Sequence, residues 1–334
     1  MSDKTESQSG SSAEKLPEWG LRERITLKGT ITALTGLRIG GTDQGLTVGG
    51  IQNILVRHAL LNEPYIPGSS LKGKLRCLLE RIYGIAGKPH GEMIQFGPAH
   101  DPECSVVQLF GNAADGNAAI PSRLIVRDAR LSEPSRKQLS TLRGELRMSE
   151  VKTEVCIDRV TSAANPRTME RVPAGAEFEF EIVLEVRAVP SSAPKEPTAP
   201  ARKDESLLEK TLKAQNNRRT KDNDWGRNDD LKLLLIALDL LQDDALGGQG
   251  SRGYGRVNLA LTKIEFRNRD SYLKNNLKKD EDPLHLKIDD ENAFKEAFGD
   301  KDGPDLWQRI QWFNKRGGDQ KEALQKSLAQ LGAT

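Results

Sequence analysis

Residues 25–34 read ITLKGTITAL, and this stretch sets the start of the fold. Apolar or small side chains occupy every second position, and threonine or lysine occupies the positions between them. Because successive side chains of a strand point to opposite faces, the alternation predicts a strand with one buried face. Three further stretches predict strands: RLIVRDARL at 123–131, EFEFEIVLEV at 177–186 and VNLALTKIEF at 257–266.

The stretch SSLKGKLRCLLERIYG, residues 69–84, has the spacing of a helix. Ser69 or Ser70 is expected to cap its start, and Gly84 is expected to end it. Its apolar side chains recur every three or four residues and predict one buried face: Leu71, Leu75, Leu78, Leu79 and Ile82.

Residues 231–246 are strongly apolar and predict a second helix, with Asp229 or Asp230 as its N-cap and Gly247-Gly248 as its end. The core order is therefore strand, helix, strand, strand, helix, strand. That order is the split βαβ, ferredoxin-like arrangement, which RNA-recognition-motif domains share. The sequence thus predicts an α+β fold with a βαββαβ core and large insertions.

Composition excludes several classes of protein. The chain has 334 residues, with 50 Lys+Arg against 48 Asp+Glu and a formal net charge of +2. Three cysteines are too few for a disulfide scaffold, and no run approaches the ~18 apolar residues of a membrane span. The first residues, MSDKTESQSGSSAEK, lack the apolar segment of a secretory signal. We therefore expect a cytoplasmic protein without membrane partners, in which any basic surface is local.

Shifts in composition divide the chain. Residues 1–20 are Ser-rich and predict a disordered tail. Residues 21–189 and 229–266 carry the two parts of the core, and the Pro- and charge-rich segment 190–228 predicts a mobile insertion. Residues 267–334 predict a charged extension with helices at 292–298, 304–314 and 320–331.

The start of the first helix, GSSLKGK (68–74), fits the phosphate-binding pattern G-x-x-x-x-G-K. A nucleotide site would also need Ser or Thr after the lysine, where Leu75 stands. A nucleotide site would further need a hydrophobic strand that ends in a metal-binding aspartate. LLLIALD, at 233–239, has that pattern but is better interpreted as a helix. A second interpretation is a site for a nucleic-acid phosphate, since a helix N-terminus attracts anions. A third is an ordinary solvated basic face.

Two other glycine-rich stretches carry arginine, RIGG (38–41) and GGQGSRGYGR (247–256). In the second, Arg252, Tyr254 and Arg256 offer charge and stacking. The domain thus has three basic segments that contain flexible glycines. Together they favour a surface that binds along an RNA backbone.

These motifs identify a family resemblance. The chain resembles the RAMP superfamily, and specifically the repeating backbone subunit of type III CRISPR effector complexes. The resemblance covers about residues 22–266 and rests on these stretches, in family order: TGLRIGG (35–41), VGGIQNILVRH (48–58), YIPGSSLKGKLR (65–76), LFG (109–111), VTSAANPRTMERVPAGAEFEF (160–180) and LGGQGSRGYGRV (246–257).

The resemblance implies a subunit that stacks along a CRISPR guide RNA, with a thumb-like hairpin at about 145–172 that interrupts the guide–target duplex. The expected partners are guide RNA, complementary target RNA, sibling RAMP subunits and the large type III effector subunit. The implied thumb contacts are Arg159, Asn165 and Arg167. The implied guide contacts are Arg38, Arg57, Ser69, Ser70, Lys72, Lys74, Arg76, Gly248, Gly250, Arg252, Gly253 and Arg256.

One departure from the family concerns activity. Active members carry an aspartate needed for metal-dependent cutting of target RNA where this chain has Gln52, and His58 replaces another aspartate. An amide is neither an anionic metal ligand nor a general base. We expect RNA binding without cutting. The alternative is a RAMP-type endoribonuclease acting on target or precursor guide RNA, with Asp43 or His58 as substitute and Mg²⁺ as cofactor.

The motifs themselves assign no cofactor, but some relatives hold zinc in the loop before LFG. Here that loop contains His90, His100 and Cys104, and Cys77 or Asp101 is a possible fourth ligand. The relatives' second cysteine is replaced by Val107. The alternative is an ordinary surface loop.

Overall fold

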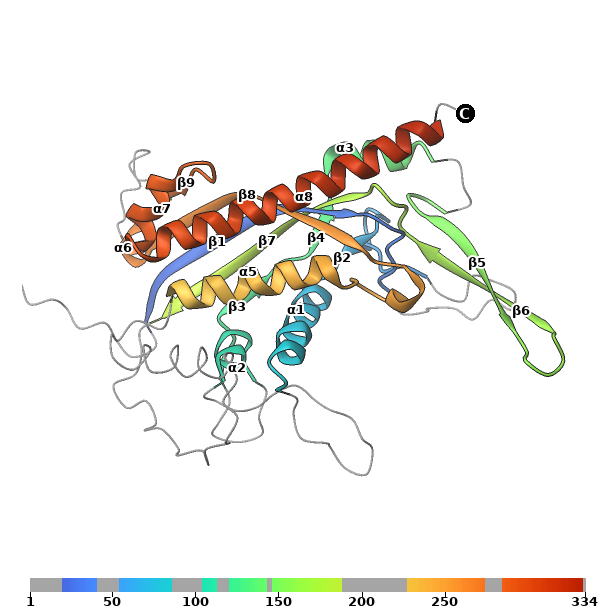
Figure 1. Cartoon of the computed structure of the whole chain (residues 1–334), viewed down its shortest axis with the longest axis horizontal. Helices are drawn as coiled ribbons and strands as arrows, with labels where there is room; N and C mark the ends of the chain where they lie inside the picture. Colours follow the sequence, from blue (N-terminus) through green and yellow to red (C-terminus); the bar gives the residue numbers. More distant parts are fainter. Residues whose placement is uncertain are drawn as a thin grey trace, which may run out of the picture.

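A computed structural model describes residues 20–40, 54–85, 104–112, 120–142, 146–187, 227–273 and 284–332. Its main sheet is built on three long antiparallel strands (Figure 1): β1 (Leu21–Ala33), β7 (Glu177–Arg187) and β8 (Val257–Asn268). β1 lies between the other two and pairs with both. All three strands stand where alternation predicts them.

Short strands extend this sheet on both sides: β2 (Tyr65–Ile66), β3 (Leu124–Val126), β4 (Ala129–Leu131) and β9 (Leu284–Leu286). β3 and β4 pair with separate parts of β7. They replace the single strand predicted at 123–131, because the chain leaves the sheet between them. There the Asp128 carboxylate turns away to accept a hydrogen bond from the Gly68 N–H at 2.8 Å.

The core topology is ferredoxin-like. Strands run in the order β3/β4, β7, β1, β8 across the sheet. α1 (Gly68–Ile82) follows β1 in the chain, and α5 (Arg227–Asp243) joins β7 to β8. With β3/β4 counted as one strand, this is the predicted βαββαβ order, and the fold prediction is confirmed.

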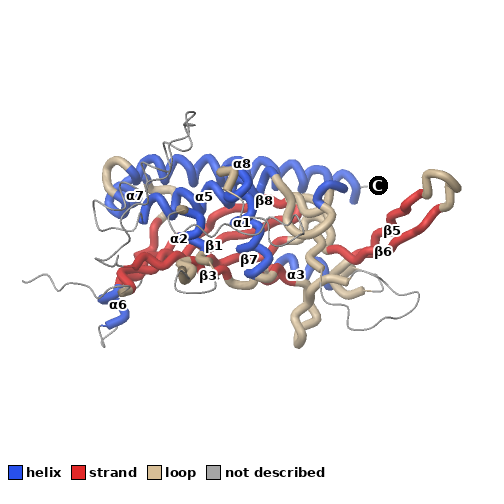
Figure 2. The backbone as a smooth tube through the Cα atoms, turned by 90° about the horizontal axis from the view of Figure 1, so that it is seen from below, coloured by secondary structure: helices blue, strands red, loops and turns tan. Residues whose placement is uncertain are grey.

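The helices cover one face of the sheet. Ile25, Leu27 and Ile31 on β1 are fully buried under α1 and α5, and their neighbours in sequence face the other way. Leu71 and Leu75 of α1 are also fully buried. Figure 2 shows α5 and α8 (Asp302–Gly332) along the same side of the strands.

The long helix α8 closes the edge of β8. The side-chain amide of Asn314 accepts from the Leu261 N–H at 2.9 Å and donates to the Leu261 carbonyl at 3.0 Å, as a neighbouring strand would. At Gly317 an added Cβ would lie 2.7 Å from the Leu259 carbonyl oxygen. The prediction of two helices ending near 314 and restarting at 320 is wrong, because Gly317 serves this close approach inside one continuous helix.

A separate antiparallel hairpin projects from the sheet (Figures 1 and 2). It consists of β5 (Glu150–Ile157) and β6 (Ala164–Arg171), paired from Glu150–Arg171 to Ile157–Ala164. The interval 145–172, predicted to be thumb-like, therefore forms a hairpin.

The predicted helix caps are corrected. Pro67 is the N-cap of α1, so Ser69 and Ser70 lie inside its first turn. Asp229 and Asp230 likewise lie in the first turn of α5. Asp230 is buried and forms an ion pair with buried Arg123, which explains why it is not a cap. The predicted end of α1 is confirmed, since Gly84 follows the helix with a φ of 63°.

The remaining elements are α2 (Ser105–Phe110), α3 (Glu133–Ser140), the 3₁₀ turn η1 (Gly250–Arg252), α6 (Arg269–Leu273) and α7 (Glu291–Phe298). α7 confirms the helix predicted at 292–298. Within the described ranges, no helix combines the length and apolar character of a membrane span. The predicted tail before Gly20 and almost all of the insertion at 190–228 lie outside the described residues.

Candidate nucleic-acid interface

Two of the glycine-rich segments meet at one end of the sheet. The Gly248 N–H donates to the Arg38 carbonyl at 2.8 Å, and the Gly255 N–H donates to the Gly36 carbonyl at 2.9 Å. Gly247 has a φ of 80°, and a Cβ there would lie 2.2 Å from the Arg38 oxygen. Only glycine fits this approach. We call the paired segments 36–40 and 246–256 the glycine rim.

The tight turns of the glycine rim carry cationic side chains that face solvent. Arg252 and Arg256 are exposed, and Arg38 is half-buried. Arg252 donates to the side chain of Gln249 within the same turn. Gly248, Gly250 and Gly253 belong to the same segment, and Gly253 ends its 3₁₀ turn with a φ of 85°. The structure thus brings the predicted residues of both segments together.

Helix α1 borders the rim through Asp244, which directly follows α5. The Asp244 carboxylate accepts from Lys74 Nζ at 3.0 Å and from Arg81 Nη1 at 3.1 Å. Burial alone would raise the pKa of Asp244, but the hydrogen bond from Lys74 and the nearby cations hold it below its ordinary value. Sequence reasoning missed this acid, and no local signal marks it.

The N-terminus of α1 is occupied by the protein's own carboxylate. Asp128 accepts from the first N–H of the helix, that of Gly68. The predicted phosphate site at this N-terminus is therefore already filled by an anion. The nucleotide interpretation is also wrong: the described strand pairs are antiparallel, and residues 233–239 are helical in α5. Of the two predicted serines, Ser69 is exposed and Ser70 half-buried.

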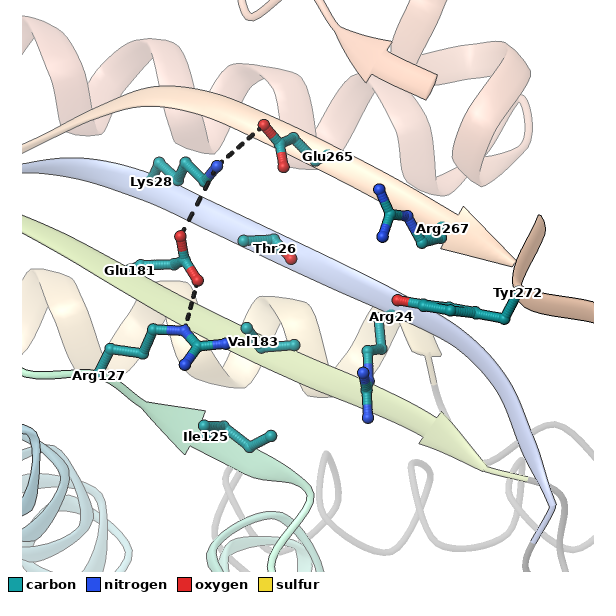
Figure 3. A pocket seen from close by; sticks show the side chains of 10 residues that line it. All are labelled: Arg24, Thr26, Lys28, Ile125, Arg127, Glu181, Val183, Glu265, Arg267 and Tyr272. Carbon is teal, nitrogen blue, oxygen red and sulfur yellow. Dashed lines mark hydrogen bonds and ion pairs between the residues drawn. The ribbon is translucent and has the colours of Figure 1, made fainter. Parts of the chain in front are cut away.

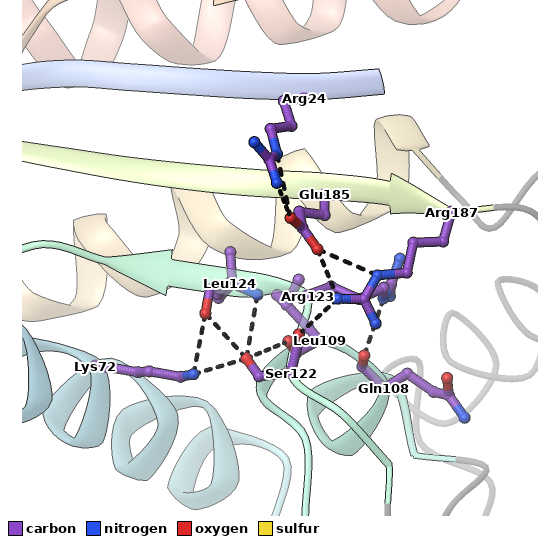
Figure 4. Close-up of polar contacts among 9 residues, drawn as sticks. All are labelled: Arg24, Lys72, Gln108, Leu109, Ser122, Arg123, Leu124, Glu185 and Arg187. Atoms are coloured by element: carbon purple, nitrogen blue, oxygen red, sulfur yellow. Dashed lines mark hydrogen bonds and ion pairs between the residues drawn. The ribbon is translucent and has the colours of Figure 1, made fainter. Parts of the chain in front are cut away.

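Two cations of α1 hold the helix against the core: Lys72, shown in Figure 4, and Arg76. Lys72 Nζ donates to Ser122 Oγ at 2.6 Å and to the Leu124 carbonyl at 3.1 Å. Burial, with a smaller effect of Arg76, lowers the pKa of Lys72. Arg76 donates to Glu80 at 2.7 Å and to the Gly111 carbonyl at 2.8 Å. The structure places both predicted guide contacts in intramolecular bonds.

Arg57 and His58 also make internal contacts. Arg57 donates to the Asn62 carbonyl and to Ser149 Oγ, each at 2.9 Å, and forms an ion pair with Glu170. His58 Nδ1 accepts weak hydrogen bonds from the N–H groups of the turn that follows, at 3.3 and 3.4 Å. Nδ1 of His58 therefore faces its own turn.

Several predicted residues lie outside the described part of the chain: Gln52, Asp43, His90 and His100. Of the predicted zinc ligands, Cys104 is described and is the N-cap of α2, packed against the core. Cys77 is exposed on α1. Among the described residues, no three His, Cys, Asp or Glu side chains cluster as a metal site would require. The zinc hypothesis stays a prediction.

Tyr254 does not offer a stacking surface. Its side chain is only 1% exposed, because it is inserted between the glycine rim and the base of the hairpin. The prediction that it stacks on RNA bases is wrong.

The hairpin has two unlike faces. Val151, Val155 and Ile157 point to one side and are 43–55% exposed, and Val160 in the turn is 92% exposed. Arg159, Asn165 and Arg167, the predicted thumb contacts, are exposed as well. The apolar row was missed, although the alternation within VKTEVCI, residues 151–157, marks it.

The open face of the sheet carries a groove of about 230 Å³ (Figure 3). Its lining contains four cationic side chains, those of Arg24, Lys28, Arg127 and Arg267, and two carboxylates, those of Glu181 and Glu265. Lys28 Nζ lies 3.1 Å from Glu265 and 3.7 Å from Glu181, and Arg127 lies 2.6 Å from Glu181. An RNA-recognition motif stacks bases on aromatic side chains of this face. Here the central strands present Thr26, Lys28, Glu181 and Val183 to the groove instead. The glycine rim is therefore the better candidate interface.

Fold and site together define the class: a palm of RNA-recognition-motif type with a basic glycine rim and a projecting hairpin. The chain belongs to the RAMP superfamily, whose family model matches residues 30–258. Its relatives include the CRISPR system Cms endoribonuclease Csm3 of Streptococcus thermophilus, 35% identical over 70% of this chain and 86% of that protein. The protein of the same name from Methanocaldococcus jannaschii is 34% identical over 84% of this chain and 96% of that protein.

Among solved structures, a Csm3–Csm4 subcomplex of the type III-A CRISPR-Cas interference complex matches at 24% identity with a TM-score of 0.42. It covers 79% of this chain and 90% of that one. Csm3 of Methanopyrus kandleri matches at 21% identity with a TM-score of 0.43, over 76% of this chain and 80% of that one.

Proposed function

We propose that this chain is a backbone subunit of a type III CRISPR effector complex that binds guide RNA along its glycine rim. The observation that carries the proposal is the meeting of segments 36–40 and 246–256 beside α1 and the hairpin. It occurs in a chain 31–35% identical to proteins named Csm3 over 70–84% of its length. Its partners are the guide, the complementary target RNA, sibling subunits and the large effector subunit, in the cytoplasm.

The rim suits a polyanionic backbone rather than individual bases. Exposed Arg252 and Arg256 supply charge, and glycines without side chains let the RNA backbone approach the main chain closely. Base pairing with the guide then reads sequence, while the protein recognises shape and phosphates. Such binding weakens steeply as salt concentration rises.

The hairpin supplies the second part of the function, which is to shape the guide–target duplex. Apolar side chains inserted at a base step unstack it and distort a duplex. Val160 at the tip and the row Val155 and Ile157 offer such a wedge, and the exposed side chains of Arg159 and Arg167 offer positive charge for phosphates.

Cutting is not part of the proposed function. The relatives are named endoribonucleases, but Gln52 replaces the family aspartate, and His58 Nδ1 is engaged in its own turn. The alternative, a RAMP-type endoribonuclease, is favoured by the relatives' names. It would require Mg²⁺ and an acid other than residue 52.

The test is RNA binding by the full chain across a salt series. Arg252→Ala with Arg256→Ala should weaken guide binding at least tenfold and flatten the plot of log affinity against log salt. Arg127→Ala is the matched control, since this arginine is 60% exposed but lies on the open face. Equal losses in both variants, or a flat salt response of the wild type, would overturn the rim as the binding surface.

A further inference from the structure

Tyr254 connects the glycine rim to the hairpin. Its hydroxyl donates to Glu154 Oε1 of β5 at 2.7 Å. Its ring lies 4.8 Å from Lys152 Nζ and 5.0 Å from the guanidinium carbon of Arg171, so cations of both hairpin strands contact it. One buried side chain of the rim therefore binds both strands of the hairpin.

Arg171 extends this joint to the other segment of the rim. A Cβ added at Gly36 would lie 2.5 Å from Arg171 Cδ, so the arginine stem lies directly on the Gly36 backbone. Arg171 Nε also donates to Glu150 at 2.7 Å. The side chain is thus enclosed by Gly36, Tyr254 and Glu150. Both rim segments contact the hairpin at this point.

The other face of the hairpin root is held separately. Glu170, next to Arg171 on β6, accepts from Ser149 Oγ at 2.7 Å and from the Leu55 N–H at 2.8 Å. Adjacent strand residues point to opposite faces. The root is therefore held on both faces. The backbone of rim segment 36–40 also reaches it, through the pairing of Leu37 with Val172 and of Gly40 with Leu55, whereas Tyr254 is the contact from segment 246–256.

We infer that Tyr254 is a positioning residue: it sets the angle of the hairpin relative to the glycine rim. What this angle means for RNA binding rests on the proposed function. A strand of eight residues spans about 26 Å, so a tilt of about ten degrees at the root moves the tip by about 5 Å. That exceeds the ~3.4 Å spacing of nucleotides along a strand. Without the contacts of Tyr254, the tip of the hairpin would contact several neighbouring base steps of the duplex instead of one.

Two native cysteines allow a direct measurement. Cys77 on α1 and Cys156 on β5 are both exposed. In a chain with Cys104→Ser, spin labels on these two report the distance between palm and hairpin without RNA. We expect a narrow distance distribution in the parent chain and a distribution at least twice as wide in Tyr254→Ala.

Tyr272→Ala is the matched control. Tyr272 also contacts two arginines, Arg24 at 5.6 Å and Arg267 at 5.2 Å, but it lies on the open face of the sheet. Its loss should leave the distance distribution unchanged. Because Tyr254 is buried, Tyr254→Phe is measured as well. It removes only the hydroxyl and should shift or widen the distribution while keeping the cooperative unfolding of the parent.

An unchanged distribution in Tyr254→Phe and in a folded Tyr254→Ala would overturn the inference. So would equal widening in Tyr272→Ala. The RNA consequence is read from 2-aminopurine placed along the target strand of a guide–target duplex. The parent should unstack defined positions, and Tyr254→Ala should spread the signal over neighbouring ones. If the parent binds no guide, the proposed function fails, while the spin-label distances still decide the role of Tyr254.

Discussion

The guanidinium of Arg57 and the carboxylate of Glu170 form an ion pair at the root of the hairpin, although 113 residues separate them in the chain. The Glu170 side chain is 2% exposed and the Arg57 side chain 17%. Ser149 and the Leu55 N–H complete the hydrogen bonding of the carboxylate. This pair therefore joins the segment around Arg57 to β6.

Removal of the Glu170 side chain should lower the free energy of unfolding. Loss of one partner from a buried ion pair costs about 3–5 kcal/mol, and the partial exposure of Arg57 favours the lower end. We expect Glu170→Ala to lower the free energy of unfolding by about 3 kcal/mol in urea denaturation. Glu150→Ala is the control: Glu150 pairs with Arg171 on the same hairpin but is 42% exposed, so its loss should cost no more than about 1 kcal/mol. Similar costs in the two variants would contradict this account.

Asp244 should act as an internal competitor of RNA. Its carboxylate binds Lys74 and Arg81, two cations at the border of the rim. Asp244→Asn removes the charge but keeps an oxygen for the Ala245 N–H, which donates to it at 2.6 Å. We expect guide affinity to rise about fivefold, equivalent to about 1 kcal/mol. The log–log salt slope should steepen by about 0.7 for each cation that gains a phosphate.

Asp302→Asn provides the control for this gain. Asp302 is 31% exposed, as Asp244 is, and pairs with Lys232 at 2.8 Å, at the opposite end of α5 from Asp244. A general effect of lost negative charge would raise affinity equally in both variants. That result, or an unchanged Asp244→Asn, would show that Lys74 and Arg81 do not reach the RNA.

Local patterns predicted the strands and helices of the core because burial repeats every two residues in β1 and every three or four in α1. They also located both glycine segments, since positions such as Gly247 tolerate no side chain. What they missed depends on distant partners. Asp128 fills the helix N-terminus from a loop 60 residues away, and Tyr254 is buried by a hairpin 100 residues away. The gap predicted between residues 314 and 320 is helical, and Gly317 within it contacts the backbone of β8.

The joint at Tyr254 should respond to acid. The hydrogen bond from Tyr254, aided by Lys152 and the nearby Arg252, holds the pKa of Glu154 below its ordinary 4.5 despite partial burial. A carboxyl whose pKa is lower when folded stabilises the fold fully above its unfolded value, and this contribution is lost as the pH falls through the folded value. The unfolding free energy of the parent should therefore exceed that of Glu154→Gln at pH 7, and the difference should shrink below about pH 4.5. A difference that grows in acid would contradict the pairing.

The last prediction concerns Gln52, where the family resemblance implies a catalytic aspartate. A carboxylate can bind Mg²⁺ or accept a proton, whereas an amide does neither as an anion. With guide and complementary target RNA bound, we expect the wild type to leave the target intact in Mg²⁺ and Gln52→Asp to cut it, with EDTA abolishing the cutting. His58 replaces a second family aspartate, so Gln52→Asp with His58→Asp should cut faster than the single variant. Cutting by the wild type that is lost in Asp43→Ala or His58→Ala would instead establish a relocated active site, and the chain would be an endoribonuclease.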